Sequence, residues 1–414
     1  MHAEEDEVTQ AQSTVLDEAA AIAGDIAELR HAIHREPEIG LDLPKTQRKV
    51  LGALEGLPLE ITTGERLSSV TAVLRGGKPG PTVLLRGDMD ALPVREATSL
   101  PYASTIDGTM HACGHDLHVA MLAGAAKLLC DRRAELSGNV IFMFQPGEEG
   151  YGGAEIMIDE EGLLSAAGER PVAAYGLHVS SDRDPTGVFS TRPGPLMAAA
   201  DVIEVTVQGR GGHASRPHVS ADPIPAACEM VTALQTLVTR RFDIFDPVVI
   251  TVGSFHAGTV HNVIPDEATF QATLRSFSDE TRRRLEDESA RLVRNIGAAH
   301  GLSVEARWVP GYPVTANDAG EAAFASECAR GLFGAERVTT MAHPIPGAED
   351  FSYVLREVPG AFMFLGACPS GTDPATAPSN HSARAIFADE VLADGTALLT
   401  ELALRRLAFA EDQI

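Results

Sequence analysis

The sequence has few cysteines, no long apolar run and no basic leader. Its 414 residues include five cysteines, an odd number with wide spacings and no C-x-x-C pair. This argues against a disulfide framework and favours a reducing compartment. No apolar run approaches the roughly 18 residues that a membrane-spanning helix requires. The N-terminus is acidic and has no apolar core, so we expect no signal peptide and a cytoplasmic location.

Basic side chains are also scarce compared with acidic ones. The chain has 33 Lys and Arg against 58 Asp and Glu, which gives a formal net charge of −25. Such a chain repels phosphate backbones and anionic bilayers, so we expect neither nucleic acid nor a membrane as a partner. The length is greater than one hydrophobic core usually supports and suits two domains.

Apolar strands and helical periods alternate through most of the chain. Strands are predicted over residues 82–86, 139–144, 172–177 and 361–365. Strands that alternate with helices imply βαβ units, because parallel strands need a crossover connection. The fold class predicted is therefore α/β, with a mixed, largely parallel sheet flanked by helices.

The pattern changes at about residue 190. Strands predicted over residues 201–207, 248–252 and 267–274 alternate apolar and polar side chains, as half-exposed strands do. With the helices between them they read β-α-β-β-α, a small α+β unit that resembles a ferredoxin-like sandwich. We therefore predict an inserted domain, 190–305, between two parts of one α/β domain, 1–189 and 306–414.

Three imidazoles, a thiol and a carboxylate crowd into the segment HACGHDLH, residues 111–118. An apolar run that predicts a buried helix follows it. Burying such a cluster would cost several kcal/mol unless something compensates it. A metal ion would do so, because zinc, and less strictly manganese or cobalt, accepts thiolate and imidazole ligands. The alternative is a redox-active or merely polar start to the helix.

Further candidate ligands follow other predicted strands. Glu148 and Glu149 come after a buried strand, so one could bind a metal while the other faces a metal-bound water as a base. A solvated acidic turn would have the same sequence. His178 ends another apolar strand, where a lone histidine is more often a core residue, and His381 lies in a polar loop.

Two more patterns lie near these groups. Asp88 and Asp90 close a strand with one residue between them, so both carboxylates point to one side, and one could hold a ligand imidazole. His213 lies in a string that formally matches a dinucleotide-binding G-x-G-x-x-A fingerprint. We discount the match, because Pro217, Pro223 and other prolines crowd the place where the phosphate-binding helix should begin.

Taken in order, these segments resemble the co-catalytic-metal amidohydrolases of the aminoacylase and glutamate-carboxypeptidase clan. The sequence is most similar to the branch with hippurate hydrolase, indole-acetyl-amino-acid hydrolases and bacterial N-acyl-amino-acid amidohydrolases. The resemblance covers nearly the whole chain. The strings that carry it are His34 with Pro37-Glu38, Asp88-Met-Asp90-Ala-Leu-Pro93, HACGHDLH, Gln145-Pro-Gly-Glu-Glu-Gly150, Gly-His213-Ala-Ser-x-Pro, His261-Asn-Val-Ile-Pro265 and Gly347-Ala-Glu-Asp-Phe351.

The resemblance implies a di-zinc exopeptidase-like fold in which the insertion acts as a lid and dimerisation domain. It implies two divalent metal ions per subunit, zinc first, with manganese or cobalt as alternatives. Cys113 would bridge the two ions, with His115 and His178 completing one site, and Glu149 and His381 the other.

The resemblance also assigns roles outside the ligand set. Glu148 would be the general base, and Asp90 would orient His115. His213 would reach the partner subunit's site in a homodimer and stabilise the oxyanion. Asn262 and Arg275 match positions that hold the substrate carboxylate, for which the planar fork of arginine is suited.

Two positions depart from the pattern of many relatives. Alanine follows His381-Ser where many relatives have proline, and Asp42 stands where Glu is common. The alanine is expected to change the geometry of the loop that carries His381 but not the assignment of His381 as a ligand. Asp42 is expected to have a structural role.

The predicted function is metal-dependent hydrolysis of the amide bond of small N-acyl amino acids, releasing a carboxylic acid and a free amino acid. A dipeptidase or metallocarboxypeptidase acting on short peptides is the alternative within the enzyme class. A non-catalytic protein that holds an amino-acid conjugate and a dinucleotide-dependent oxidoreductase are the alternatives outside it.

Overall fold

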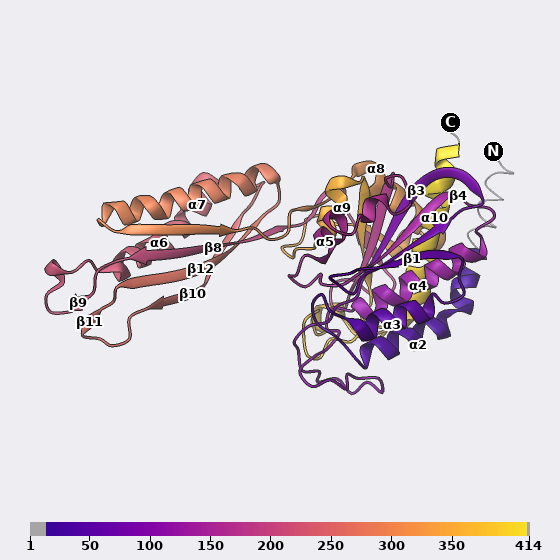
Figure 1. Cartoon of the computed structure of the whole chain (residues 1–414), viewed down its shortest axis with the longest axis horizontal. Coiled ribbons are helices and arrows are strands. Elements are labelled where there is room, and N and C mark those ends of the chain that lie inside the picture. The colour runs from indigo at the N-terminus through magenta and orange to yellow at the C-terminus, as the bar shows by residue number, and fades with distance from the viewer. Residues whose placement is uncertain (1–13, 412–414) are drawn as a thin grey trace. The chain divides into compact units, whose positions relative to one another are not determined.

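The structure, a computed structural model, describes residues 14–411 in two compact units (Figure 1). Unit 1 extends to Gly194 and includes Ala316–Ala342 and the chain from Tyr353 onward, whereas unit 2 comprises Pro195–Thr315 and His343–Ser352. Each unit has a hydrophobic core of its own. The acidic N-terminal residues on which the signal-peptide expectation rests lie outside the described residues.

Unit 1 is built on an eight-stranded sheet with the order β1-β2-β4-β3-β5-β16-β6-β15. Its central strands β4, β3, β5 and β16 run parallel, while β1, β2 and β6 add antiparallel neighbours. This confirms the predicted α/β class with a mixed, largely parallel sheet. The strands are β1 (Leu59–Thr63), β2 (Val70–Arg75), β3 (Lys78–Asp88), β4 (Ser137–Gln145), β5 (Ala173–Ser180), β6 (Phe189–Thr191), β15 (Val338–Thr340) and β16 (Gly360–Gly366).

Helices flank this sheet, and both α4 and α10 pack on its central strands β3, β4 and β5. Nearly every side chain of α4 is buried, because the helix packs against β3, α2 and α10 at once. Gly87 permits the close approach, since a Cβ there would lie 2.8 Å from the main-chain oxygen of His118. The helices are residues 14–21, α2 (Ala23–His34), α3 (Pro44–Ala53), α4 (His115–Asp131), α5 (Gly153–Asp159), α8 (Ala319–Phe333), α9 (Phe351–Glu357) and α10 (Leu392–Glu411), with short 3-10 turns η1 (Leu163–Ser165), η3 (Ala335–Arg337), η4 (Pro374–Thr376) and η5 (Asp389–Val391).

Unit 2 has a four-stranded antiparallel sheet with the order β10-β12-β8-β13, and the helices α6 and α7 pack on it and on each other (Figure 1). In chain order these elements read βαββαβ, the arrangement of a ferredoxin-like sandwich. They are β8 (Ala199–Gln208), α6 (Pro223–Arg241), β10 (Val249–Ala257), β12 (Glu267–Ser276), α7 (Asp279–Ala299) and β13 (Ser303–Val309), with β9 (Gly212–His213), η2 (Pro217–Val219) and β11 (Val263–Ile264) in the loops.

The edges of unit 2 differ from the predicted insertion. The sequence analysis did not include β13, and the predicted boundary at 305 falls inside that strand. The longer part of unit 2, Pro195–Thr315, begins within the short strand β7 (Gly194–Met197) and ends at the first residue of the short strand β14 (Thr315–Asn317). None of the helices between residues 14 and 411 has both the length and the apolarity needed to cross a membrane.

Candidate metal centre

The candidate ligands of unit 1 converge at the carboxyl ends of its parallel strands. Glu148 and Glu149 follow β4, and His178 lies near the end of β5. Cys113 precedes α4, and His115 is its first residue. Loops at this edge of a parallel sheet are the usual place for a functional site, because the strands deliver them side by side.

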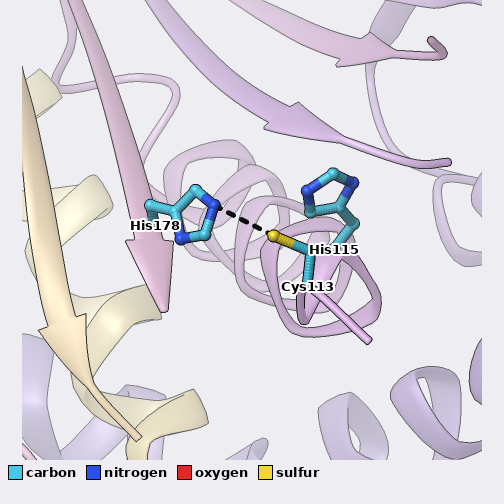
Figure 2. Close-up of side chains that lie close together, drawn as sticks. All are labelled: Cys113, His115 and His178. Atoms are coloured by element: carbon cyan, nitrogen blue, oxygen red, sulfur yellow. Dashed lines mark hydrogen bonds between the residues drawn. The ribbon is translucent and has the colours of Figure 1, made fainter. Parts of the chain in front are cut away.

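The thiol of Cys113 lies between two sets of possible ligands. Its Sγ atom is 3.4 Å from Nε2 of His178 and 3.3 Å from Nε2 of His381. Figure 2 shows this sulfur directed toward the ring of His178, with the ring of His115 beside it. The ligand atoms of Cys113, His115 and His178 all lie within 4.8 Å of one another, and so do those of Cys113, Glu149 and His381.

The two sets share only the sulfur, which is the arrangement that a bridging thiolate between two cations requires. Glu149 Oε1 lies 3.2 Å from Nε2 of His381. Both ring nitrogens of His115 are buried and make no hydrogen bond, and Oε1 of Glu149 makes none either, although it forms an ion pair with His381. Such groups cost about 1–3 kcal/mol each when they stay unpaired. A cation held by these donors would remove that cost, so the residues fit a metal ion.

The imidazoles of the cluster differ in their pKa. Burial and the neighbouring His118 hold the pKa of His178 well below its ordinary value, which leaves the neutral ring that binds metals. Burial also opposes a charge on His115, but Asp88, Asp90 and Cys113 together outweigh it and raise the pKa of His115 well above the ordinary value. Hydrogen bonds to Cys113 and Glu149 raise the pKa of His381 to about 10. At His115 and His381, a proton and a metal ion therefore compete for the same ring.

Asp90 holds the turn that carries the two glutamates. Its Oδ1 accepts the main-chain N–H of Glu148 at 3.0 Å, and its Oδ2 accepts that of Glu149 at 3.0 Å. The Oδ1 atom also lies 3.4 Å from Nδ1 of His115. Glu148 is only 6% exposed, and a carboxylate oxygen of it lies within 4.8 Å of the ligand atoms of His115 and Glu149. One buried carboxylate thus fixes the positions of three neighbours in the cluster.

A second buried array lies beside the cluster, and the sequence analysis did not identify it. Asp88 pairs with Arg86 at 2.8 Å and with Nδ1 of His118 at 2.5 Å. Nε2 of His118 accepts the main-chain N–H of Val179 at 2.8 Å, so its proton must be on Nδ1. The signal for this array was a charged pair, Arg86 and Asp88, at the end of an otherwise apolar strand.

The predicted site residues of unit 2 lie within that unit in two places. β9 pairs with β11, so that His213 is opposite Val263, and the main-chain N–H of Ala214 donates to the oxygen of Asn262 at 3.1 Å. His213 and Asn262 are therefore neighbours, and both are exposed.

Arg275 lies near the other end of β12. It pairs with Ala200 and with Val249, whereas the end of the strand at Glu267 is next to Gln208 and the β9–β11 loops. Eight residues of strand correspond to roughly 27 Å. Unit 2 thus brings His213 and Asn262 together and keeps Arg275 apart from them. Burial lowers the pKa of Arg275.

Comparison with known proteins adds to this geometry. The model of peptidase family M20/M25/M40 matches residues 84–405. The chain is 39% identical to N-acetylcysteine deacetylase of Bacillus subtilis (strain 168) over 349 residues, 84% of this chain and 89% of that protein. It is 37% identical to thermostable carboxypeptidase 2 of Saccharolobus solfataricus over 384 residues, 92% of this chain and 95% of that protein.

A solved structure extends the likeness to the fold. It is described as a dinuclear metal binding peptidase of the M20 family from Bacillus subtilis. It superposes with a TM-score of 0.80 at 32% sequence identity, and the match covers 94% of this chain and 99% of that one.

Proposed function

We propose, from the premise that the chain belongs to peptidase family M20/M25/M40, that it hydrolyses the amide bond of N-acyl amino acids and releases a carboxylic acid and a free amino acid. It is an enzyme that hydrolyses amides. The observation that carries the proposal is the pair of ligand sets that share the sulfur of Cys113, with Glu148 beside them. The similarity to N-acetylcysteine deacetylase supports an N-acyl amino acid as the substrate class.

The same cluster supports two divalent metal ions per subunit, as in the dinuclear relative. Cys113 would bridge them, His115 and His178 would complete one site, and Glu149 and His381 the other. We propose zinc, since thiolate and imidazole are its preferred ligands, with manganese or cobalt as alternatives. When bound, the ions would polarise the amide oxygen and lower the pKa of a shared water towards about 7.

The chain's own residues would do the rest of the chemistry. Glu148 would accept a proton from the attacking water and later deliver it to the departing amine. Its burial keeps bulk water from competing for that proton. Asp90 accepts hydrogen bonds from the main chain of both Glu148 and Glu149, so it would fix the position of the base relative to that of the ligand.

The substrate-binding residues would come from two subunits of a homodimer. Arg275 would bind the substrate carboxylate bidentately. Asn262 would also bind the substrate carboxylate, and His213 would stabilise the oxyanion. The unit 2 of a single subunit cannot bring Arg275, His213 and Asn262 to the same substrate molecule, because roughly 27 Å of strand separates Arg275 from the other two residues. A partner subunit that supplies His213 and Asn262 would remove this conflict.

An edge strand supports that dimer. β10 is at the edge of its sheet, and Val249 and Phe255 on it are 40% and 38% exposed. An unprotected edge with apolar side chains is a template for pairing with another chain. Light scattering of the purified protein would test this, and a monomer at micromolar concentration would contradict it. We also propose a cytoplasmic location, which the five free cysteines suit.

Removal and return of metal tests the main proposal. Exhaustive chelation should abolish hydrolysis of acyl-amino acids, and adding zinc, manganese or cobalt should restore it. Activity that persists after chelation would contradict the proposal. The similarity to a carboxypeptidase favours a second candidate, cleavage of short peptides. Parallel assays with acyl-glycine, acyl-glutamine, acyl-aspartate and indole-acyl conjugates against dipeptides would separate the two.

A further inference from the structure

The side chain of Asn380 contacts two segments of unit 1 other than its own. Its amide nitrogen donates to the main-chain oxygen of Cys113 at 3.3 Å and to that of Val179 at 3.1 Å. Its amide oxygen accepts the main-chain N–H of Ser181 at 2.9 Å. These segments carry Cys113 and, one residue before Val179, His178. The residue after Asn380 is His381, so one amide group connects three segments that hold proposed ligands.

Main-chain partners fix which way this amide points. A carbonyl oxygen can only accept a hydrogen bond, and a main-chain N–H can only donate one. The nitrogen of Asn380 must therefore face Cys113 and Val179, and its oxygen must face Ser181. In this orientation Nδ2 lies 3.7 Å from Sγ of Cys113. Because the amide nitrogen has only two N–H groups, the one that faces the main-chain oxygen of Cys113 is shared with the sulfur of the same residue.

The backbone beside Asn380 is strained. His381 has a φ of 69° and is the only non-glycine residue with a positive φ among residues 14–411. Left-handed backbone is unfavourable for an L-residue, because its Cβ crowds the following carbonyl oxygen, and such residues persist where the surroundings hold them. Here the main-chain N–H of His381 donates to the oxygen of Ala112 at 2.8 Å, while Asn380 anchors the residue before it.

We propose that Asn380 is a positioning residue of the metal centre, which sets the spacing of Cys113, His178 and His381 and donates an N–H···S hydrogen bond to the thiolate of Cys113. The inference rests on the proposed function only in taking these three residues as ligands. The bond lowers the energy of the sulfur lone pairs, and the links to Val179 and Ser181 keep the His381 loop against β5. Hydrogen bonds around a metal's ligands commonly govern its affinity in this way.

The test compares two variants of Asn380 with a control at Ser181, whose side chain also contacts Asn380. N380L keeps the branched shape of the side chain without donors, acceptors or charge, and N380A removes it. S181A is the control. It removes a hydroxyl that donates to Pro378 at 2.8 Å and contacts Oδ1 of Asn380 at 3.0 Å, but it leaves the main-chain N–H and the contacts to Cys113 intact.

The measurements use the full chain, stripped of metal, and Co²⁺ alone as the probe. Competition with a chelator gives the affinity, and near-ultraviolet absorption gives the sulfur-to-cobalt charge-transfer band. We expect N380L and N380A to weaken Co²⁺ binding by about 10–100-fold. We also expect them to move the band to longer wavelength, because the sulfur lone pairs lose a donor. S181A should bind within about twofold of the wild type, with its band unmoved.

Several results would overturn the inference. If N380L binds Co²⁺ with unchanged affinity and an unmoved band, the amide N–H of Asn380 has no effect on the sulfur. If N380L does not fold, the affinity and the band of N380A decide the question instead. A wild-type protein that binds Co²⁺ without a thiolate band, or a band that survives C113A, would remove Cys113 as the ligand. A wild type that shows the band but hydrolyses no acyl-amino acid would contradict the proposed function and leave the role of Asn380 standing.

Discussion

Replacing Asp90 with asparagine tests whether one carboxylate holds the turn that carries Glu148 and Glu149. Both oxygens of Asp90 accept main-chain N–H groups at 3.0 Å, from Glu148 and Glu149, and the side chain is 1% exposed. Asparagine has one oxygen and one amide nitrogen. Either Glu148 or Glu149 must therefore lose its acceptor and face another N–H, whichever way the amide turns.

The expected loss of stability follows from these bonds. An unsatisfied buried N–H costs about 1–3 kcal/mol, and changing the remaining bond from a charged to a neutral acceptor costs about 1 kcal/mol more. We expect D90N to lower the free energy of unfolding of the metal-free protein by about 2–4 kcal/mol, measured by urea denaturation. Metal affinity should also fall, since the same carboxylate faces Nδ1 of His115.

An exposed aspartate gives the control. Asp107 pairs with Arg95 at 2.8 Å, and the two side chains are 75% and 76% exposed. D107N should change stability by less than about 1 kcal/mol, because exposed ion pairs contribute little. If D90N unfolds within about 0.5 kcal/mol of the wild type and keeps its metal affinity, the role assigned to Asp90 is wrong.

Three further predictions concern the base, a buried histidine and the substrate. E148Q should keep its metal content and lose about 10²–10⁴-fold in kcat; equal loss of metal and turnover in metal analysis would make Glu148 a ligand instead. Burial opposes a charge on His34, but Asp116 outweighs it and raises the pKa of His34 to about 9. The stability that this charge contributes is complete below about pH 6.5 and is lost as the pH rises through about 9. The difference in the free energy of unfolding between the wild type and H34Q, measured at several pH values, should therefore shrink by roughly 3 kcal/mol over that window. A difference that grows with pH would contradict the assignment. R275K should raise KM about tenfold with little change in kcat, because lysine lacks the bidentate fork, and a loss confined to kcat would argue against carboxylate binding.

The α/β class could be predicted because the central strands of unit 1 are apolar along their whole length. β4 and β16 are buried at nearly every position, as strands covered on both faces must be. The strand order could not be predicted. β2 and β3 are consecutive in the chain, yet β4 lies between them in the sheet, and the sequence carries no signal for that insertion.

β3 begins earlier than the sequence predicts, because glycines occupy its first residues and those just before it. The sequence predicts a strand only over residues 82–86, because the glycines and proline of residues 76–80 are typical of a turn, but the strand begins at Lys78 and pairs with Ser137. A Cβ on Gly77 would lie 2.6 Å from the oxygen of Ala134, and one on Gly80 would lie 2.3 Å from that of Ser137. These glycines allow backbones to approach closely, a use that sequence alone does not distinguish from a turn.

The candidate ligands could be identified because histidine, cysteine and acidic residues follow predicted strands. Their roles as ligands, base and orienting group remain proposals. The residues that hold them in place could not be identified. Asn380 precedes the candidate ligand His381, but nothing in the local sequence shows that its side chain contacts segments about 200 and 267 residues away. Such long-range contacts are fixed by the tertiary fold, which local patterns do not encode.

The position of β16 affects how the chain can acquire its structure during synthesis. β16 lies between β5 and β6 in the sheet, although it leaves the ribosome some 170 residues after them. Until then the nascent α/β unit has an open seam at its middle, next to the segment that carries His178. The loop with His381 emerges later still. A chain that ended before β16 would leave β5 and β6 without the strand that lies between them, and it would also lack His381, one of the proposed ligands.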